Sequence, residues 1–134
     1  MNSGQCAVDD TVASPRVRSF RDLRVWQKSM DLTVTIYRLT GSFPREEVFG
    51  LSSQLRRSAV SIPSNIAEGQ GRLNTGEFRQ FLGIARGSNC ELLTQLEIAR
   101  MLGYGDAKMI DEAEGLSNEV GKMINAILKS LTDD

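Results

Sequence analysis

The sequence predicts an all-α protein, built as an antiparallel up-and-down four-helix bundle. The 134 residues suffice for one domain with a single core. Leucine, alanine, arginine, glutamate and glutamine are plentiful, and the chain has only three prolines, a composition that favours helix. Four segments carry apolar residues at helical spacing and are joined by short connections, which make neighbouring helices antiparallel.

The first segments of the chain are a tail and a helix with two apolar stripes. Residues 1–18 have no apolar period and are expected to form a disordered tail, whereas residues 19–134 form the bundle domain. A helix is predicted over residues 23–39 with Asp22 as its N-cap. One stripe contains Leu23, Trp26, Met30, Val34 and Tyr37. The nearly opposite stripe predicts a contact with another copy of the chain, because a lone bundle needs one apolar face. Its members are Val25, Leu32, Ile36 and Leu39.

A second helix is predicted over residues 46–69, and it contains a proline. Pro63 lacks an amide hydrogen and clashes with the preceding turn, at a cost of about 3 kcal/mol in a helix interior. We therefore expect a kink or a local break there. Polar side chains nearby can satisfy the freed backbone groups, which predicts a network at Ser61, Pro63, Asn65 and Glu68. The alternative is that these residues form a ligand or RNA site.

Two more helices complete the predicted bundle. The third opens at Asn74, with Glu77 placed for a capping box, and runs to about Leu102. Asn89 falls within its core stripe, where a buried amide needs hydrogen-bond partners. Ile84 and Ile98 point away from that stripe and are again candidates for a contact between protomers. The fourth helix is capped by Asp106 and ends near residue 131.

The composition argues against an enzyme. The chain has no histidine, so its cysteines (Cys6 and Cys90) and serines lack the commonest activating base. No spacing predicts a metal site, a nucleotide loop or another cofactor site, and we identify no small-molecule substrate. No apolar run approaches the roughly 20 residues that span a bilayer, and no signal peptide is recognisable. We therefore expect a cytoplasmic protein with free thiols and no membrane association.

Arginines provide the main functional signal. Residues 16–86 contain 12 basic and 6 acidic residues, whereas residues 87–134 contain 4 and 9. Arginine suits phosphate contacts because its guanidinium donates two parallel hydrogen bonds. Candidate nucleic-acid contacts are Arg56, Arg57, Arg72, Arg79 and Arg86. One hypothesis is an oligomeric bundle that binds RNA or a ribonucleoprotein through these arginines. The alternative is a protein-interaction scaffold in which these arginines form ion pairs between subunits, with Glu91, Glu97, Glu119 and others. The two oppositely charged halves could also simply pair with each other across the bundle.

The segment at residues 56–69 reads Arg-Arg-Ser-Ala-Val-Ser-Ile-Pro-Ser-Asn-Ile-Ala-Glu-Gly. It resembles the signature of a bacterial family of four-helix-bundle proteins, some of them encoded by intervening sequences within large-subunit ribosomal RNA genes. Similar segments extend the resemblance from about Phe20 to Leu131. The resemblance implies that copies of this chain associate with one another as a homo-oligomer, specifically a pentamer. A related branch, the accessory proteins of diversity-generating retroelements, implies RNA or a nucleic-acid enzyme as a further partner.

Overall fold

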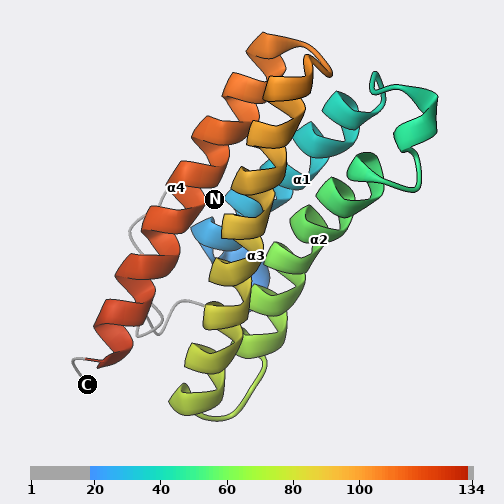
Figure 1. Cartoon of the computed structure of the whole chain (residues 1–134). Coiled ribbons are helices and arrows are strands. Elements are labelled where there is room, and N and C mark those ends of the chain that lie inside the picture. The colour runs from blue at the N-terminus through green and yellow to red at the C-terminus, as the bar shows by residue number, and fades with distance from the viewer. Residues whose placement is uncertain (1–18, 133–134) are drawn as a thin grey trace.

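The computed structural model describes residues 19–132, which form four α-helices and, within that range, no strand (Figure 1). The α-helices are α1 (Arg24–Thr40), α2 (Leu51–Gln70), α3 (Thr75–Leu102) and α4 (Ala107–Thr132). Two short 3-10 helices are η2 (Phe20–Asp22) and η3 (Arg45–Glu47). The prediction of an all-helical chain with four helices is confirmed. The tail predicted over residues 1–18 lies outside the described residues.

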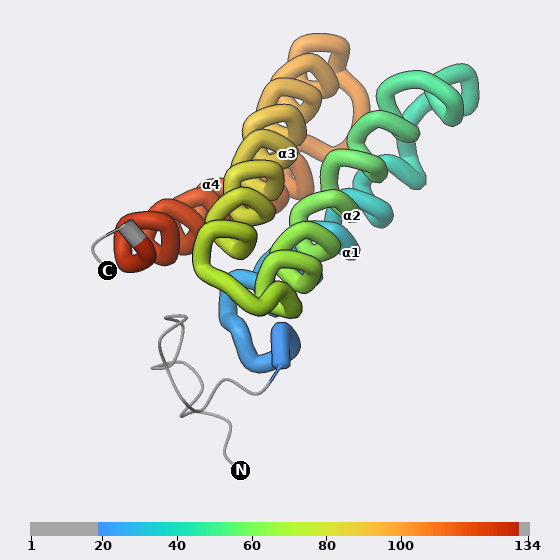
Figure 2. Tube along the Cα trace, turned by 90° about the horizontal axis from the view of Figure 1, so that it is seen from below, coloured from blue at the N-terminus to red at the C-terminus, as the bar shows by residue number. Residues whose placement is uncertain are grey.

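The helices enclose one apolar core. Helix α1 packs against α2 and α4, and α3 packs against the same two helices. Figure 2 accordingly shows α2 and α4 on opposite sides of α3. Each helix contributes fully buried aliphatic side chains to this core, among them Leu32, Leu55, Leu92 and Ile124.

Side-chain caps explain where the helices begin. Asn74 accepts a hydrogen bond from the Glu77 amide at 2.8 Å, and Asp106 accepts one from the Lys108 amide at 3.1 Å, so both predicted N-caps are confirmed. The reciprocal bond from the Asn74 amide to the Glu77 carboxylate, which the predicted capping box requires, is not formed within the described residues. The predicted cap of the first helix is wrong. Asp22 belongs to η2, where it forms a reciprocal capping box with Ser19, and α1 begins after the buried Leu23.

Helix α1 buries the stripe that was assigned to a contact between protomers. Val25, Leu32, Ile36 and Leu39 are at most 1% exposed in the core of their own chain, so that prediction is wrong. Two hydroxyls on this face are also buried, but Ser29 and Thr40 donate to carbonyl groups of α1 itself at 2.8 Å. With these hydroxyls satisfied, the whole face can pack closely against the neighbouring helices.

Helix α2 continues without a break through Pro63, and it starts later than predicted. Residues 51–70 form one continuous α-helix, so the expected local break is absent. Pro63 deprives the Ala59 carbonyl of its ordinary donor four residues later. The Thr33 hydroxyl of α1 lies 3.1 Å from the Ala59 oxygen and 2.8 Å from that of Ser29, so the two carbonyls share its single proton. The packing of α1 on α2 therefore places a shared donor beside the carbonyl that the proline leaves without its helical partner.

We expect Thr33→Val to lower the free energy of unfolding by about 0.5–1.5 kcal/mol, because it removes this hydroxyl while keeping the side chain's shape. In a Pro63→Ala background the cost should be smaller, since the amide of the new residue can donate to the Ala59 carbonyl. Urea denaturation of the two single variants and the double variant measures this coupling. Equal costs in both backgrounds would show that Thr33 does not compensate for the proline.

A close approach to α2 and a pair of buried hydrogen bonds to α4 fix the position of α3. A Cβ atom added to Gly69 would lie 2.7 Å from the Phe81 Cβ, so the glycine allows α2 and α3 to approach near this end. On the other side of α3, the buried Asn89 amide donates to the Ser117 carbonyl at 3.0 Å and accepts from the Ser117 hydroxyl at 2.6 Å. The predicted need of Asn89 for partners is confirmed, and α4 supplies them.

Candidate functional site

A hollow on the outer side of α2 combines arginine and aromatic side chains. It has a volume of about 560 Å³ and lies between α1, the α1–α2 connection and α2. We call it the aromatic hollow; its lining residues are Tyr37, Val48, Phe49, Ser53, Arg56, Arg57, Val60 and Ser61. Sequence reasoning identified the two arginines but missed the aromatic residues, which come from α1 and from the connection before α2.

Phe49 stands at 95% exposure on a segment that is held in place from both sides. One carboxylate oxygen of Glu47 accepts from the Leu51 amide at 3.0 Å and so caps α2. The other accepts from the Tyr104 hydroxyl at 3.1 Å, and this hydrogen bond raises the pKa of Tyr104. A large apolar side chain on a fixed backbone, facing solvent, is suited to stacking with a planar ligand.

The two arginines of the hollow have different environments. Arg56 donates from Nε to the Thr40 hydroxyl at 2.8 Å, and its guanidinium lies 4.7 Å from the centroid of the Tyr37 ring. These interactions hold Arg56 against α1. Arg57 is exposed and forms no ion pair with the described part of the chain. An anion entering the hollow therefore meets one oriented guanidinium and one that has no competing carboxylate.

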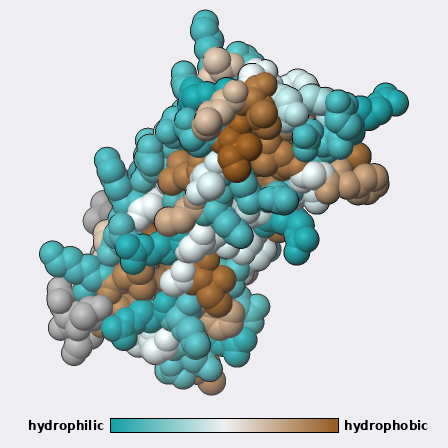
Figure 3. All heavy atoms as spheres, in the orientation of Figure 1, coloured by the Kyte–Doolittle hydropathy of each residue, from teal (hydrophilic) through white to brown (hydrophobic). Residues whose placement is uncertain are grey.

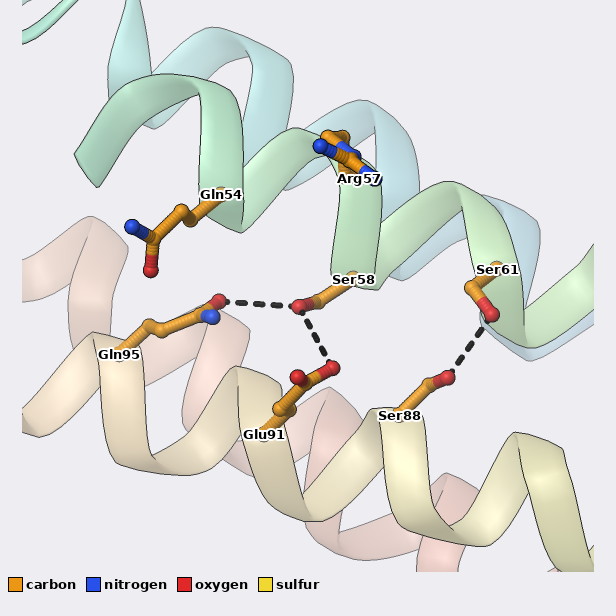
Figure 4. Close-up of a pocket in the computed structure, with 7 residues that line it drawn as sticks. All are labelled: Gln54, Arg57, Ser58, Ser61, Ser88, Glu91 and Gln95. Carbon is orange, nitrogen blue, oxygen red and sulfur yellow. Dashed lines mark hydrogen bonds between the residues drawn. The ribbon is translucent and has the colours of Figure 1, made fainter. Parts of the chain in front are cut away.

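A second hollow, the polar groove, lies between α2 and α3 and has a volume of about 460 Å³. Figure 4 shows the facing side chains of the two helices. The Ser58 hydroxyl lies 3.0 Å from the Gln95 Oε1 and 3.3 Å from the Glu91 Oε1. Gln54 also lines the groove, and Arg57 rises from the outer side of α2 at its rim. Arg57 and Ser61 line both hollows, which are therefore adjacent.

The predicted polar network exists with a different membership. The Asn65 amide donates to the Ser61 carbonyl at 2.8 Å and to its hydroxyl at 3.0 Å, and the Ser61 and Ser88 hydroxyls are 2.8 Å apart. The network thus joins α2 to α3 rather than closing around Pro63. Glu68 lies outside it and pairs with Arg72 at 2.7 Å.

The five predicted arginines do not form one surface. Arg72 pairs with Glu68 and lies over the Phe81 ring at 4.9 Å. Arg79 and Arg86 are exposed on α3. Because successive helical residues turn by about 100°, they lie about 120–140° around α3 from Glu91, which lines the groove with α2. Of the five, Arg56 and Arg57 come together in the aromatic hollow.

Some opposite charges pair within the chain, as one alternative anticipated. Lys28 of the basic half pairs with Glu119 of the acidic half at 3.2 Å. Arg100 joins α3 to α4 through Asp111 at 3.0 Å and Glu114 at 2.8 Å. The hydrogen bond to Asp111 raises the pKa of Arg100. None of these pairs involves Arg57.

Apolar side chains are also exposed away from the hollows. Met30 and Val34 are exposed on the face of α1 opposite its buried stripe, and Ile84 and Ile98 are exposed on α3. Figure 3 shows apolar surface gathered over the upper part of α3, the end at which α4 begins. Over residues 19–132, no helix is long and apolar enough to cross a membrane, and no cluster of potential metal ligands is found.

The fold defines a small helical-bundle protein. The part of α2 that holds the string at residues 56–69 lines both the aromatic hollow and the polar groove. The chain belongs to the 23S rRNA-intervening sequence protein family, which it matches over residues 21–126. It is similar to a crystal structure from the S23 ribosomal protein family of Bacteroides thetaiotaomicron, a protein of unknown function. The TM-score is 0.71 and the identity 27%, covering 78% of this chain and 98% of that chain. No curated protein matches the sequence.

Proposed function

We propose that this chain is a non-enzymatic, self-associating antiparallel bundle protein that binds single-stranded RNA at the aromatic hollow. The observation that carries the proposal is the meeting of two arginines and two exposed aromatic residues in one hollow. Single-stranded RNA presents unstacked bases and phosphates, which such side chains bind by stacking and charge-assisted hydrogen bonds. In this proposal, Phe49 stacks on a base while Arg57 and Arg56 bind phosphates. Repetition of the hollow in an oligomer would increase the avidity.

The salt dependence of RNA affinity tests this proposal. For a short unstructured RNA, the logarithm of the binding constant should fall steeply with the logarithm of KCl concentration. Arg57→Ala should reduce that slope by about 0.7 for each phosphate that the arginine neutralises in the wild type. Fluorescence anisotropy of a labelled RNA gives both slopes.

The matched control is Arg86→Ala, which removes the same charge from an exposed position on α3 outside both hollows. It should leave the slope unchanged. A wild-type protein that does not bind the RNA at low salt would contradict the proposal, and so would a slope equally sensitive to both variants.

The exposed apolar residues favour a second candidate function, a protein-interaction scaffold without a nucleic-acid partner. Met30, Val34 and Tyr37 form an outward stripe on α1, and Ile84 and Ile98 are exposed on α3. Apolar patches of this kind are typical of association surfaces. Because they lie on different helices, contact between one patch and the other in a neighbouring copy would form a ring or a filament. The pentamer implied by the family resemblance is such a ring.

A further inference from the structure

The polar groove contains hydrogen-bonding groups that are not fully satisfied. Gln95 is only 8% exposed, and its side chain makes one hydrogen bond within the described residues, through Oε1 to Ser58. In this orientation of the amide, its NH₂ group has no protein partner in that part of the chain. The single Ser58 proton cannot serve Gln95 and Glu91 together, so the more distant Glu91 carboxylate retains its acceptor capacity. The buried Gln95 amide in this state needs a ligand or water, whereas Glu91 is exposed and its carboxylate is open to a ligand.

These groups specify the chemistry of a ligand. The Glu91 carboxylate can accept two neighbouring N–H groups in a bidentate arrangement. The Gln95 NH₂ group needs an acceptor, and Arg57 at the rim favours an anion. Glu91 and Gln95 are four residues apart on α3, so they lie one above the other on the same helix face. A ligand edge with two donors and one acceptor, attached to an anionic group, would satisfy all three side chains.

Guanine is the nucleobase with that edge. Its N1–H and N2–H₂ groups are adjacent donors, and its O6 atom is the acceptor beside them. The other bases offer a carboxylate no such pair of ring and exocyclic donors. The groove volume of about 460 Å³ falls within the range of ligand pockets.

We propose that the polar groove binds a guanine base of single-stranded RNA, with Glu91 accepting from N1–H and N2–H₂ and Gln95 donating to O6. The inference rests on the proposed function, because Arg57 would hold a phosphate between the guanine in the groove and the neighbouring nucleotide on Phe49. The shared lining of the two hollows by Arg57 and Ser61 supports this continuity. A guanidinium ligand from another protein fits less well, because Arg57 repels it and Gln95 gains no acceptor.

The test compares the affinities of the full chain for two short oligouridine RNAs, one with a central guanine and one with adenine there. We expect the guanine RNA to bind about tenfold more tightly, as one bidentate base contact allows. Glu91→Gln should abolish this preference, because its amide NH₂ opposes the guanine N–H groups. Glu112→Gln, an exposed change on α4 that also removes one negative charge, should keep it. Circular dichroism checks that both variants fold.

A parallel titration with GMP and AMP, followed by the amide shifts of Ser58 and Gln95, separates this inference from the proposed function. RNA binding without a guanine preference would overturn the inference and leave the proposed function intact. Shifts at both residues with GMP, but no binding of either RNA, would support the guanine site and contradict the proposed function. Shifts with free arginine instead of GMP would overturn the inference in favour of a cationic partner.

Discussion

An Ile36→Lys variant is expected to be unfolded, whereas Val34→Lys, two residues earlier on the same helix, is expected to fold normally. Ile36 is fully buried, so the change removes apolar packing and places an ammonium group among aliphatic side chains. The combined cost of several kcal/mol approaches the whole stability of a small domain, about 5–15 kcal/mol. Val34 is 47% exposed, and its change should alter stability by about 0.5 kcal/mol or less.

Far-ultraviolet circular dichroism and thermal unfolding of the two variants measure this contrast. A folded Ile36→Lys protein that becomes monomeric would restore Val25, Leu32, Ile36 and Leu39 as contacts between protomers. The folded Val34→Lys variant also tests the scaffold candidate by light scattering. A lower mass than the wild type would place the outward stripe of α1 in the contact between copies. An unchanged oligomer would remove that stripe from it.

Phe49→Ala is expected to weaken binding of single-stranded RNA by about 1–3 kcal/mol, or about fivefold to 150-fold, without changing the melting temperature. The affinity falls because the variant lacks a stacking platform for one base. Stability is unaffected because Phe49 is almost fully exposed and contributes little to the core. Anisotropy titrations and differential scanning calorimetry measure the two quantities.

Leu73→Ala is the matched control, since Leu73 is equally exposed but lies in the α2–α3 connection, outside both hollows. It should change neither RNA affinity nor stability. If Phe49→Ala binds RNA as the wild type does, Phe49 is not a stacking residue. An equal loss of affinity in the two variants would indicate a general effect of exposed apolar surface rather than a defined site.

Local signals determined much of the architecture. The caps at Asn74 and Asp106 were predictable because an N-cap interacts with amides only two or three residues further along the chain. The helical character of the four segments follows from apolar spacing, and the need of Asn89 for partners follows from its place in a core stripe. The family resemblance depends on the contiguous string at residues 56–69, so it too was visible in sequence.

The tertiary structure decided the features that depend on contacts between distant segments. Periodicity showed two apolar stripes on the first helix, and only packing against α2 and α4 determined which of them is buried. The helix remains unbroken at Pro63, where Thr33, thirty residues earlier, brings its hydroxyl within 3.1 Å of the Ala59 carbonyl, a contact that local sequence cannot reveal. Phe49 and Tyr37 join Arg56 and Arg57 only after α1 and α2 pack together. The sequence alone determined the helices, whereas the candidate site arises where their side chains meet.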